Sequence, residues 1–506
     1  MSRSKVKSCQ LSTFISGDEV LTSSQLLRRL RDHFGGNESA NRTRLARATN
    51  TPAVWRSNSL LLPKNQRLFT RRTFFRSPQF FTTVATVLET ERPGLSRLLH
   101  CLGKVEFLHE TQARKLLAAP VQESGAFPGL ERDLLALNEL GVSIRKCGSH
   151  RYVCRSDPLD ARVFDASAEL TLGELRRESL LTRVLVNRLA RRNMLSWNGT
   201  NLPCRDQLGS EFNNQLFTAF GFSYLSPLLQ FKDSKPSPCP VLFDVYAGEC
   251  SKKQVESFVH RSERAVLRRG KGRRFLGVIA ARWFVKDAWD YARERGIMAI
   301  NLVQMFGDEA LEAMALAERL MGGFQNEAIT HDLTSLFAAI GELKTNPVVV
   351  DLYSIGFEAF AGLALRDRGY GELAFGTIVP FQKTTRDVDV HARKQNELTV
   401  IESKAYHAKK PLDPSEVKRF FTETIPSYVT WWRARNGNRE PDRVRAEIWT
   451  TGSIGKDAED KLAELNLKPY VVPKFCGQKE MLEGLSFEIG SRMGQFLSAI
   501  AKGGEL

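Results

Sequence analysis

The sequence lacks long uninterrupted apolar segments. Its first twenty residues hold no apolar stretch of the kind that a secretory signal needs. The longest apolar stretch, residues 275–285, contains Arg282 and is far shorter than the ~20 residues that a membrane-spanning helix requires. We therefore expect a cytoplasmic protein that does not enter a membrane.

Cysteine and histidine are scarce, with eight of each among 506 residues. The cysteines are scattered, no two form a CxxC pair, and no spacing of cysteine and histidine matches a zinc site. The phosphate-binding loop GxxxxGK followed by Ser or Thr is also absent, so any ATP-driven motor would be a separate chain. These absences argue against a disulfide scaffold, a zinc finger and a P-loop ATPase.

What the sequence has in excess is positive charge. Lys and Arg number 73 against 57 Asp and Glu, a net charge of +16. Residues 1–75 alone hold fourteen basic and four acidic residues, so more than half of the net charge lies in this short segment. Such a balance favours a polyanionic partner, first of all nucleic acid. The length predicts roughly three or four domains.

The basic segment, residues 1–75, has the pattern of helices followed by a hairpin. Helix-capping residues at 22–24 precede an apolar helical face, and a second helix is expected at 38–48. Strands at 54–55 and 59–62, a turn at 63–65 and a return strand to residues 71–72 complete the pattern, which resembles a winged helix. We expect this unit to bind DNA, and the side chains predicted to contact phosphates are those of Arg42, Arg44, Arg47, Arg71 and Arg72.

Residues 76–158 predict a second winged-helix-like unit. Their apolar periodicity indicates helices at 80–88, 95–102, 110–117 and 131–140, followed by a hairpin at 142–154. For both units the alternative is a small helical domain that contacts other parts of the protein. Residues 159–200, which are rich in arginine, are interpreted as a helical connector.

The remainder of the chain contains two segments that look like copies of each other, residues 201–322 and 345–506, with a helical linker at 323–344. Each copy is expected to run helix, strand, helix, strand, helix, strand, which is typical of an α/β sheet. Their first helices are predicted at 209–222 and 356–370. Each copy also contains Lys-Asp-Ala at the start of a later helix. The expected fold class is therefore multidomain α/β.

The strongest chemical signal lies in the second copy, where Asp389 is followed by Glu402 and Lys404. The two segments read as strands of a hairpin around residues 394–397. In that register Arg393 faces Leu398, so Asp389 lies directly opposite Glu402. Two carboxylates that face each other repel unless a cation lies between them, and hard oxygen ligands suit Mg²⁺ or Mn²⁺.

Asp389 followed thirteen residues later by Glu402-Ser403-Lys404 resembles the D-(x)n-E-x-K core of the PD-(D/E)xK nucleases, and within them Mrr-type restriction endonucleases and archaeal Holliday-junction resolvases. The helix that carries Glu358 is similar to the acidic first helix of that fold. The resemblance implies a restriction-endonuclease-like α/β domain at 345–506. It also implies metal ligands at Asp389 and Glu402, a supplementary ligand at Glu358 and a catalytic role for Lys404.

The first copy departs from this pattern. Its corresponding strand has Asp244 in place of the Glu and Tyr246 in place of the Lys. We therefore expect residues 201–322 to be a degenerate restriction-endonuclease-like domain without catalysis, although Asp244 and Glu249 keep the capacity to bind a metal.

The resemblance implies a metal-dependent endonuclease that hydrolyses the phosphodiester bonds of double-stranded DNA with Mg²⁺ or Mn²⁺, in the setting of restriction or antiphage defence. Two alternatives stay open at this stage. One is a catalytically silent DNA-binding regulator or assembly subunit, and the other is an RNase on the same fold. A homodimer and a separate ATPase or defence-system subunit are compatible partners.

Overall fold

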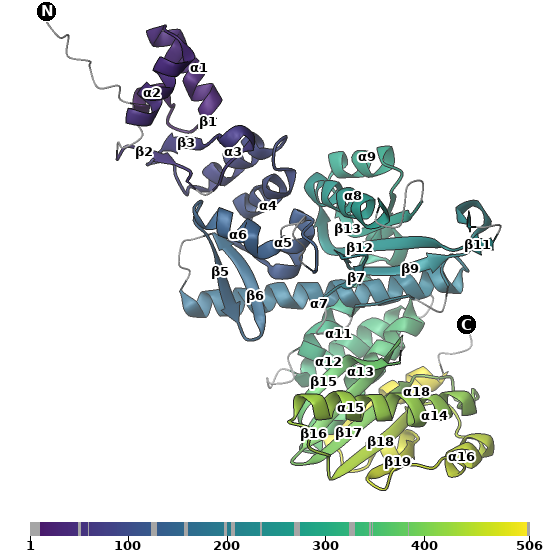
Figure 1. Ribbon diagram of the computed structural model, residues 1–506. Helices are drawn as coiled ribbons and strands as arrows, with labels where there is room; N and C mark the ends of the chain where they lie inside the picture. Colours follow the sequence, from purple (N-terminus) through teal and green to yellow (C-terminus); the bar gives the residue numbers. More distant parts are fainter. Residues whose placement is uncertain are drawn as a thin grey trace, which may run out of the picture.

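The computed structural model describes residues 11–48, 52–58, 60–122, 129–155, 160–196, 200–203, 208–232, 235–267, 274–322, 329–343, 346, 348–382 and 384–502 (Figure 1). Over these ranges the chain is a mixed α/β protein with several separate sheets. None of the helices in the described ranges combines the length and apolar character needed to cross a bilayer.

The amino-terminal unit has the predicted helices and hairpin. Its elements are η1 (Leu11–Phe14), β1 (Val20–Thr22), α1 (Ser23–Phe34), α2 (Glu38–Ala48), β2 (Val54–Arg56), η2 (Pro63–Asn65) and β3 (Leu68–Arg71). Thr22 and Gln25 cap α1 reciprocally, as the sequence predicts. The strand expected at 59–62 does not form: in its described part only Leu62 is bridged, to Gln66, because the chain turns at once through Lys64, which has a positive φ.

The second unit repeats this topology after two additional helices. Its elements are α3 (Pro78–Leu88), α4 (Pro93–Lys104), β4 (Phe107–His109), α5 (Glu110–Leu117), α6 (Leu130–Asn138), β5 (Val142–Cys147) and β6 (His150–Arg155). In both units a strand, two helices and a hairpin follow one another, and the first strand pairs with the last, giving the orders β1-β3-β2 and β4-β6-β5. One cluster of buried apolar residues, including Trp55, Phe80 and Leu137, joins the two units.

The first α/β unit is built on the four-stranded sheet β14-β13-β12-β9. Strand β9 (Ala219–Ser223) is antiparallel to β12 (Cys239–Cys250), and β12, β13 (Leu276–Phe284) and β14 (Met298–Asn301) are parallel. Its helices are α8 (Lys252–Leu267), α9 (Lys286–Glu294), α10 (Leu302–Phe306) and α11 (Asp308–Gly322). Shorter pieces are β7 (Ser210–Phe212), β8 (Gln215–Phe217), η3 (Ser226–Leu228), β10 (Gln230–Lys232) and β11 (Lys235–Ser237).

The helix predicted at 209–222 is wrong, because this segment forms β7, β8 and β9. Asn213 and Asn214 both have positive φ and reverse the chain between β7 and β8. Along β9 the burial alternates with a period of two, which is a strand pattern. The long helix that packs against β12 is instead α7 (Ala161–Arg191), the segment interpreted as a connector.

The second α/β unit contains the five-stranded sheet β15-β16-β17-β18-β19. Its strands are β15 (Gly371–Phe381), β16 (Thr384–Lys394), β17 (Glu397–Lys404), β18 (Arg443–Thr450) and β19 (Val471–Cys476), and the last three are parallel. Its helices are α12 (Ile329–Glu342), α13 (Val349–Asp367), α14 (Pro414–Arg419), the π-helical turn η4 (Phe420–Thr424), α15 (Ile425–Arg435), α16 (Lys456–Ala463), α17 (Gln478–Leu482) and α18 (Phe487–Lys502).

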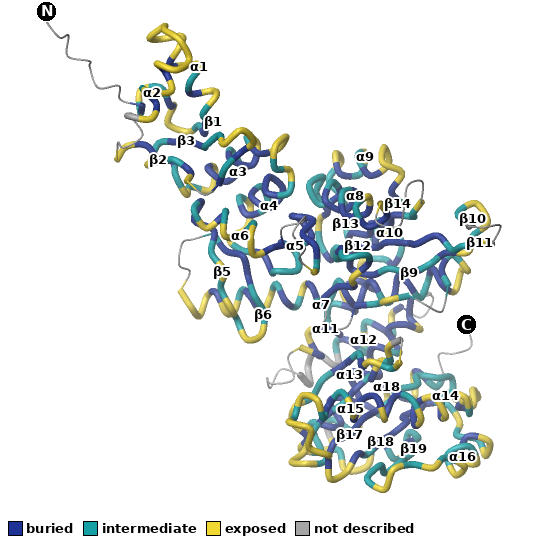
Figure 2. Tube along the Cα trace, in the orientation of Figure 1, coloured by how far each residue is buried: buried dark blue, intermediate teal, exposed yellow. Residues whose placement is uncertain are grey.

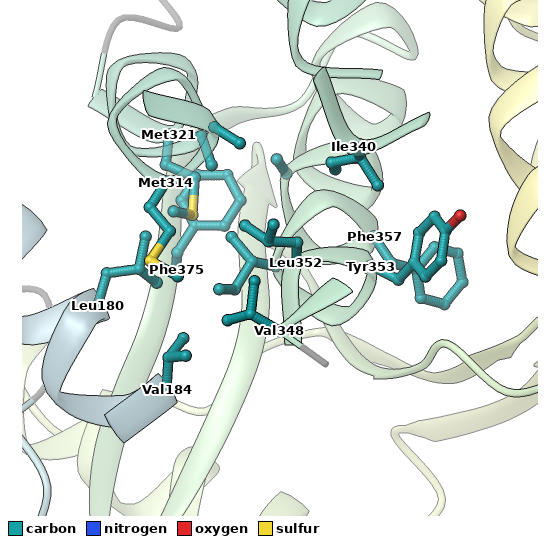
Figure 3. Packing of buried hydrophobic residues seen from close by; sticks show 14 of the residues in the cluster. Leu180, Val184, Met314, Met321, Ile340, Val348, Leu352, Tyr353, Phe357 and Phe375 are labelled. Carbon is teal, nitrogen blue, oxygen red and sulfur yellow. The ribbon is translucent and has the colours of Figure 1, made fainter. Parts of the chain in front are cut away.

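The two α/β units share an order of elements and a core. In each, a long helix (α7 or α13) precedes an antiparallel strand pair, and two further parallel strands follow across helices. Figure 1 shows α7 running between the sheet of the first α/β unit and the helices α11, α12 and α13. Leu180 and Val184 of α7 belong to the same buried cluster as Met314 and Phe375, drawn in Figure 3, and Figure 2 shows this region as a buried band.

Gly362 of α13 tests how tightly this core is packed. A Cβ atom at this position would lie 2.6 Å from Cε1 of Phe375, which is 3% exposed and held in the core. We expect Gly362→Ala to destabilise the protein by about 1–3 kcal/mol through overpacking. Gly173 of α7 has no atom near its Cβ position, so Gly173→Ala should leave the thermal midpoint unchanged or raise it. Equal midpoints for the two variants would contradict this packing.

Candidate functional site

The predicted hairpin is formed by β16 and β17 in the predicted register. Arg393 pairs with Leu398, as expected, and Lys394 also pairs with Glu397. The loop therefore has two residues rather than four, and Gln395 takes a positive φ. The hydrogen-bonded ladder ends at Val390 and Ile401, so Asp389 and Glu402 are the next pair, at the open end of the hairpin.

Beyond the last backbone pair, the two strands are joined by side-chain hydrogen bonds. Oδ2 of Asp389 accepts hydrogen bonds from the backbone N of Ser403 at 2.7 Å and from its Oγ at 2.9 Å. Nζ of Lys404 donates to Oε1 of Glu402 at 2.7 Å, and these two side chains are only 16% and 12% exposed. The structure thus brings together the three residues that the motif predicts.

The two acids, Asp389 and Glu402, are not fully neutralised by the positive charge around them. Desolvation and the neighbouring Asp389 carboxylate raise the pKa of Glu402 to about 7, against the opposing effect of Lys404. Desolvation also raises the pKa of Asp389. Burial would lower the pKa of Lys404, but the carboxylates of Glu402, Asp389 and Glu416 outweigh it and raise that pKa, so Lys404 stays an ammonium. The two acids therefore favour an additional cation or a proton.

Glu358 reaches the same region from α13 but has a different partner. Its carboxylate forms a two-pronged ion pair with Arg183 of α7, in which Nη2 contacts Oε1 and Nη1 lies 3.3 Å from Oε2. Desolvation raises the pKa of Glu358 to about 7 although Arg183 opposes this shift. In the described ranges no three acidic, His or Cys side chains stand close enough to hold a metal ion as they are placed.

A divalent cation nevertheless fits the donor chemistry at Asp389 and Glu402. Both side chains offer carboxylate oxygens, the ligands that Mg²⁺ and Mn²⁺ prefer. The raised pKa values of both acids show that their surroundings already favour added positive charge. The third predicted ligand, Glu358, is not free for this purpose while both of its oxygens face Arg183.

His391 has the structural role that its isolation suggests. Its Nε2 and Nδ1 lie within hydrogen-bonding distance of the hydroxyls of Thr377 at 2.9 Å and Tyr428 at 3.0 Å. Burial lowers the pKa of His391 to about 4, so the ring is neutral at ordinary pH. The ring anchors the sheet to α15 and does not join the acidic site.

In the first α/β unit the corresponding acid is already neutralised. Asp244 is fully buried, and its carboxylate pairs with Arg261 of α8 and, at 3.4 Å, with Lys115 of α5. These two cations outweigh desolvation and lower the pKa of Asp244. The second acid proposed for a metal, Glu249, lies exposed on the same strand. The expectation that this site keeps a metal-binding capacity is therefore not supported, because protein cations occupy the place that a metal would take.

Glu178 of α7 is a half-buried acid that sequence reasoning missed. It lies near Asp244, and its Oε1 accepts a hydrogen bond from the backbone N of Ala247 at 3.5 Å. Desolvation raises the pKa of Glu178 to about 8. The sequence carries no signal for it, because residues 159–200 are expected to form a connector and not the helix that covers β12.

The five predicted phosphate contacts differ in their surroundings. Arg42 is 69% exposed and pairs with Glu38, while Arg44 stacks on Phe34 and bonds Asn41 at 2.8 Å. Arg72 is exposed, and Arg47 lies on α2 with a side chain outside the described set. Arg71 instead donates to the backbone carbonyls of Ile15 at 2.7 Å and Ser12 at 2.9 Å. This tether engages the guanidinium within the unit and disfavours a phosphate contact.

Comparison with known proteins adds no relative: no family model matches the chain, and no curated protein does either. What the site can do is therefore argued from its own residues.

The raised pKa of Glu178 predicts a pH-dependent stability. The unfolded carboxyl ionises near 4.5 and the folded one near 8, so the folded state binds the extra proton between these values. The contribution of Glu178 to the free energy of unfolding is fully present below about pH 4.5 and is lost as the pH rises through 8. We expect Glu178→Gln to raise the thermal midpoint at pH 8.5 by several degrees relative to wild type, with little difference at pH 5. The control is Glu169→Gln, which changes an exposed acid earlier on α7 and should show no such pH-dependent difference.

Proposed function

We propose that the second α/β unit is a metal-dependent nuclease domain of the PD-(D/E)xK kind that hydrolyses phosphodiester bonds in DNA. The observation that carries this proposal is the joint placement of Asp389, Glu402 and Lys404 at the open end of one hairpin, with two acids that favour an added cation. A surface hairpin with a simple Lys–Glu pair would be solvated and would show no such raised pKa values.

The residues of this site divide the work as follows. Asp389 and Glu402 would hold Mg²⁺ or Mn²⁺, which when bound supplies activation of water and stabilisation of charge on the phosphate. Ser403 fixes the Asp389 carboxylate through its N–H and hydroxyl. Lys404 stays positively charged, so it can donate to a phosphate oxygen or orient the attacking water.

The two amino-terminal units support DNA as the substrate. Their shared topology, in which a strand, two helices and a hairpin form a sheet with the last strand in the centre, is the arrangement expected of winged helices. Arg42 and Arg72 are exposed on the first unit, where they can contact phosphates. We therefore propose that this unit binds duplex DNA through its backbone.

The catalytic proposal is tested by removing one charge at a time. We expect Asp389→Asn and Glu402→Gln each to abolish Mn²⁺-dependent cleavage of plasmid DNA while leaving DNA affinity within about threefold. Glu249→Gln, which changes an exposed acid of the first α/β unit, should cleave like wild type. Single-stranded DNA and RNA are assayed beside the plasmid. Undiminished cleavage by both site variants would remove this site from consideration, and cleavage of RNA alone would change the substrate class.

The DNA-binding proposal predicts a changed dependence on salt. Each neutralised phosphate contributes about −0.9 to the slope of log affinity against log salt concentration on duplex DNA. Replacing Arg44 and Arg47 with Ala should therefore weaken binding to all sequences alike and reduce the slope by up to ~2. Affinities measured between low and moderate salt give the slope. An unchanged slope would instead make the first unit a protein-contact module.

A further inference from the structure

The acidic site of the second α/β unit receives a charged side chain from outside that unit. Arg183 comes from α7, which packs on the sheet of the first α/β unit, and its guanidinium meets the Glu358 carboxylate end to end. The charges of Glu358, Asp389 and Asp387 together outweigh burial and raise the pKa of Arg183. Arg183 is therefore a permanent cation within electrostatic reach of the proposed metal ligand Asp389.

A small cavity lies beside the ion pair of Arg183 and Glu358. Its volume is about 100 Å³, and its polar lining includes Arg176 and Arg183 of α7 with Glu358 and Asp387. Arg176 and Arg183 are seven residues apart and therefore share one face of the helix. Nε of Arg176 is buried and has no hydrogen-bond partner among the described residues. Helix α7 thus presents two guanidinium groups to a cavity whose acids are Glu358 and Asp387 of the second α/β unit and Glu318 of α11.

The exposures of the two paired side chains indicate which of them is available. The Arg183 side chain is 28% exposed, whereas that of Glu358 is 8% exposed. A guanidinium has five N–H donors, and the pair with Glu358 uses two of them. Arg183 therefore keeps donors for another anion, while Glu358 has both oxygens committed to Arg183.

We propose that Arg183 is a catalytic residue of the nuclease site that binds the phosphate to be cleaved, and that Glu358 is a positioning residue for Arg183 rather than a metal ligand. This inference rests on the proposed nuclease function. A planar guanidinium held by a buried carboxylate is already oriented before substrate arrives, which is the condition for effective stabilisation of developing negative charge. The active site is then composite, with acids from one α/β unit and an arginine from the other.

The first experiment separates a metal ligand from a positioning residue by measuring Mn²⁺ affinity without DNA. The full-length protein is titrated with Mn²⁺ and followed by electron paramagnetic resonance. We expect Glu358→Gln to bind Mn²⁺ within about threefold of wild type, and Glu402→Gln to lose more than tenfold. A loss in Glu358→Gln equal to that in Glu402→Gln would overturn the inference and leave the nuclease proposal standing. Absence of Mn²⁺ binding in the wild type would overturn both.

The second experiment removes Arg183 without leaving an unpaired buried charge. The double variant Arg183→Gln/Glu358→Gln deletes both members of the ion pair, because removal of one alone would strand the other. We expect a kcat for DNA cleavage about 100-fold below wild type, as for other lost donors to a developing anion, with Mn²⁺ affinity retained. The single variant Arg183→Lys should be impaired as well, since an ammonium lacks the fork that serves two partners.

A matched control is available on the same two helices. Arg191 of α7 pairs with Asp351 of α13 at 3.0 and 3.1 Å, further from the acidic site. The double variant Arg191→Gln/Asp351→Asn removes an equivalent α7–α13 ion pair and should cleave DNA within about threefold of wild type. If both double variants cleave like wild type, or if both lose activity together, Arg183 only joins the helices and the inference is wrong.

Discussion

The carboxylates of Asp244, Asp389 and Glu402 are largely removed from water, and each requires positive charge nearby. The first α/β unit meets this constraint with its own side chains, because Arg261 and Lys115 surround Asp244 and lower its pKa. The second unit meets it only in part: Lys404 and, at 4.0 Å, the half-exposed Arg419 lie near Glu402, and the pKa of Glu402 still stays near 7. The two α/β units therefore differ in how completely protein cations neutralise their buried acids.

The same constraint explains why α7 is central to the architecture. Its apolar residues belong to a core shared by both α/β units, and its polar residues serve one unit each. Glu178 lies near Asp244 of the first unit, whereas Arg183 and Arg191 pair with acids on α13 of the second. Because both units pack on this helix, a substitution on one of its faces is expected to affect the packing of both units.

Features that depend on residues close together in the sequence were predicted correctly from local sequence patterns. The helix cap at Thr22, the register of Arg393 with Leu398 and the closeness of Asp389 to Glu402 follow from short-range geometry, and the structure has them. The helix predicted at 209–222 is wrong. The prediction relied on a likeness to residues 356–370, whereas burial in β9 alternates as it does in a strand. The ion pairs of Arg183 and Arg261 span 175 and 17 residues, and no sequence spacing specifies such contacts. The sequence therefore predicts the acids and Lys404, but it does not predict that Arg183 and Arg261 pair with acids of these sites.

Lys115 belongs to the second amino-terminal unit, yet its ammonium is buried against Asp244 and Thr218 of the first α/β unit. Its backbone carbonyl also accepts a hydrogen bond from Ser257 on α8. Such a joint resists hinge motion, because opening it would expose a fully buried carboxylate without its partner. The second amino-terminal unit is thereby held in a fixed orientation on the first α/β unit. Under the proposed function, this rigidity would place the cleaved bond at a constant distance from the DNA segment bound by the amino-terminal units.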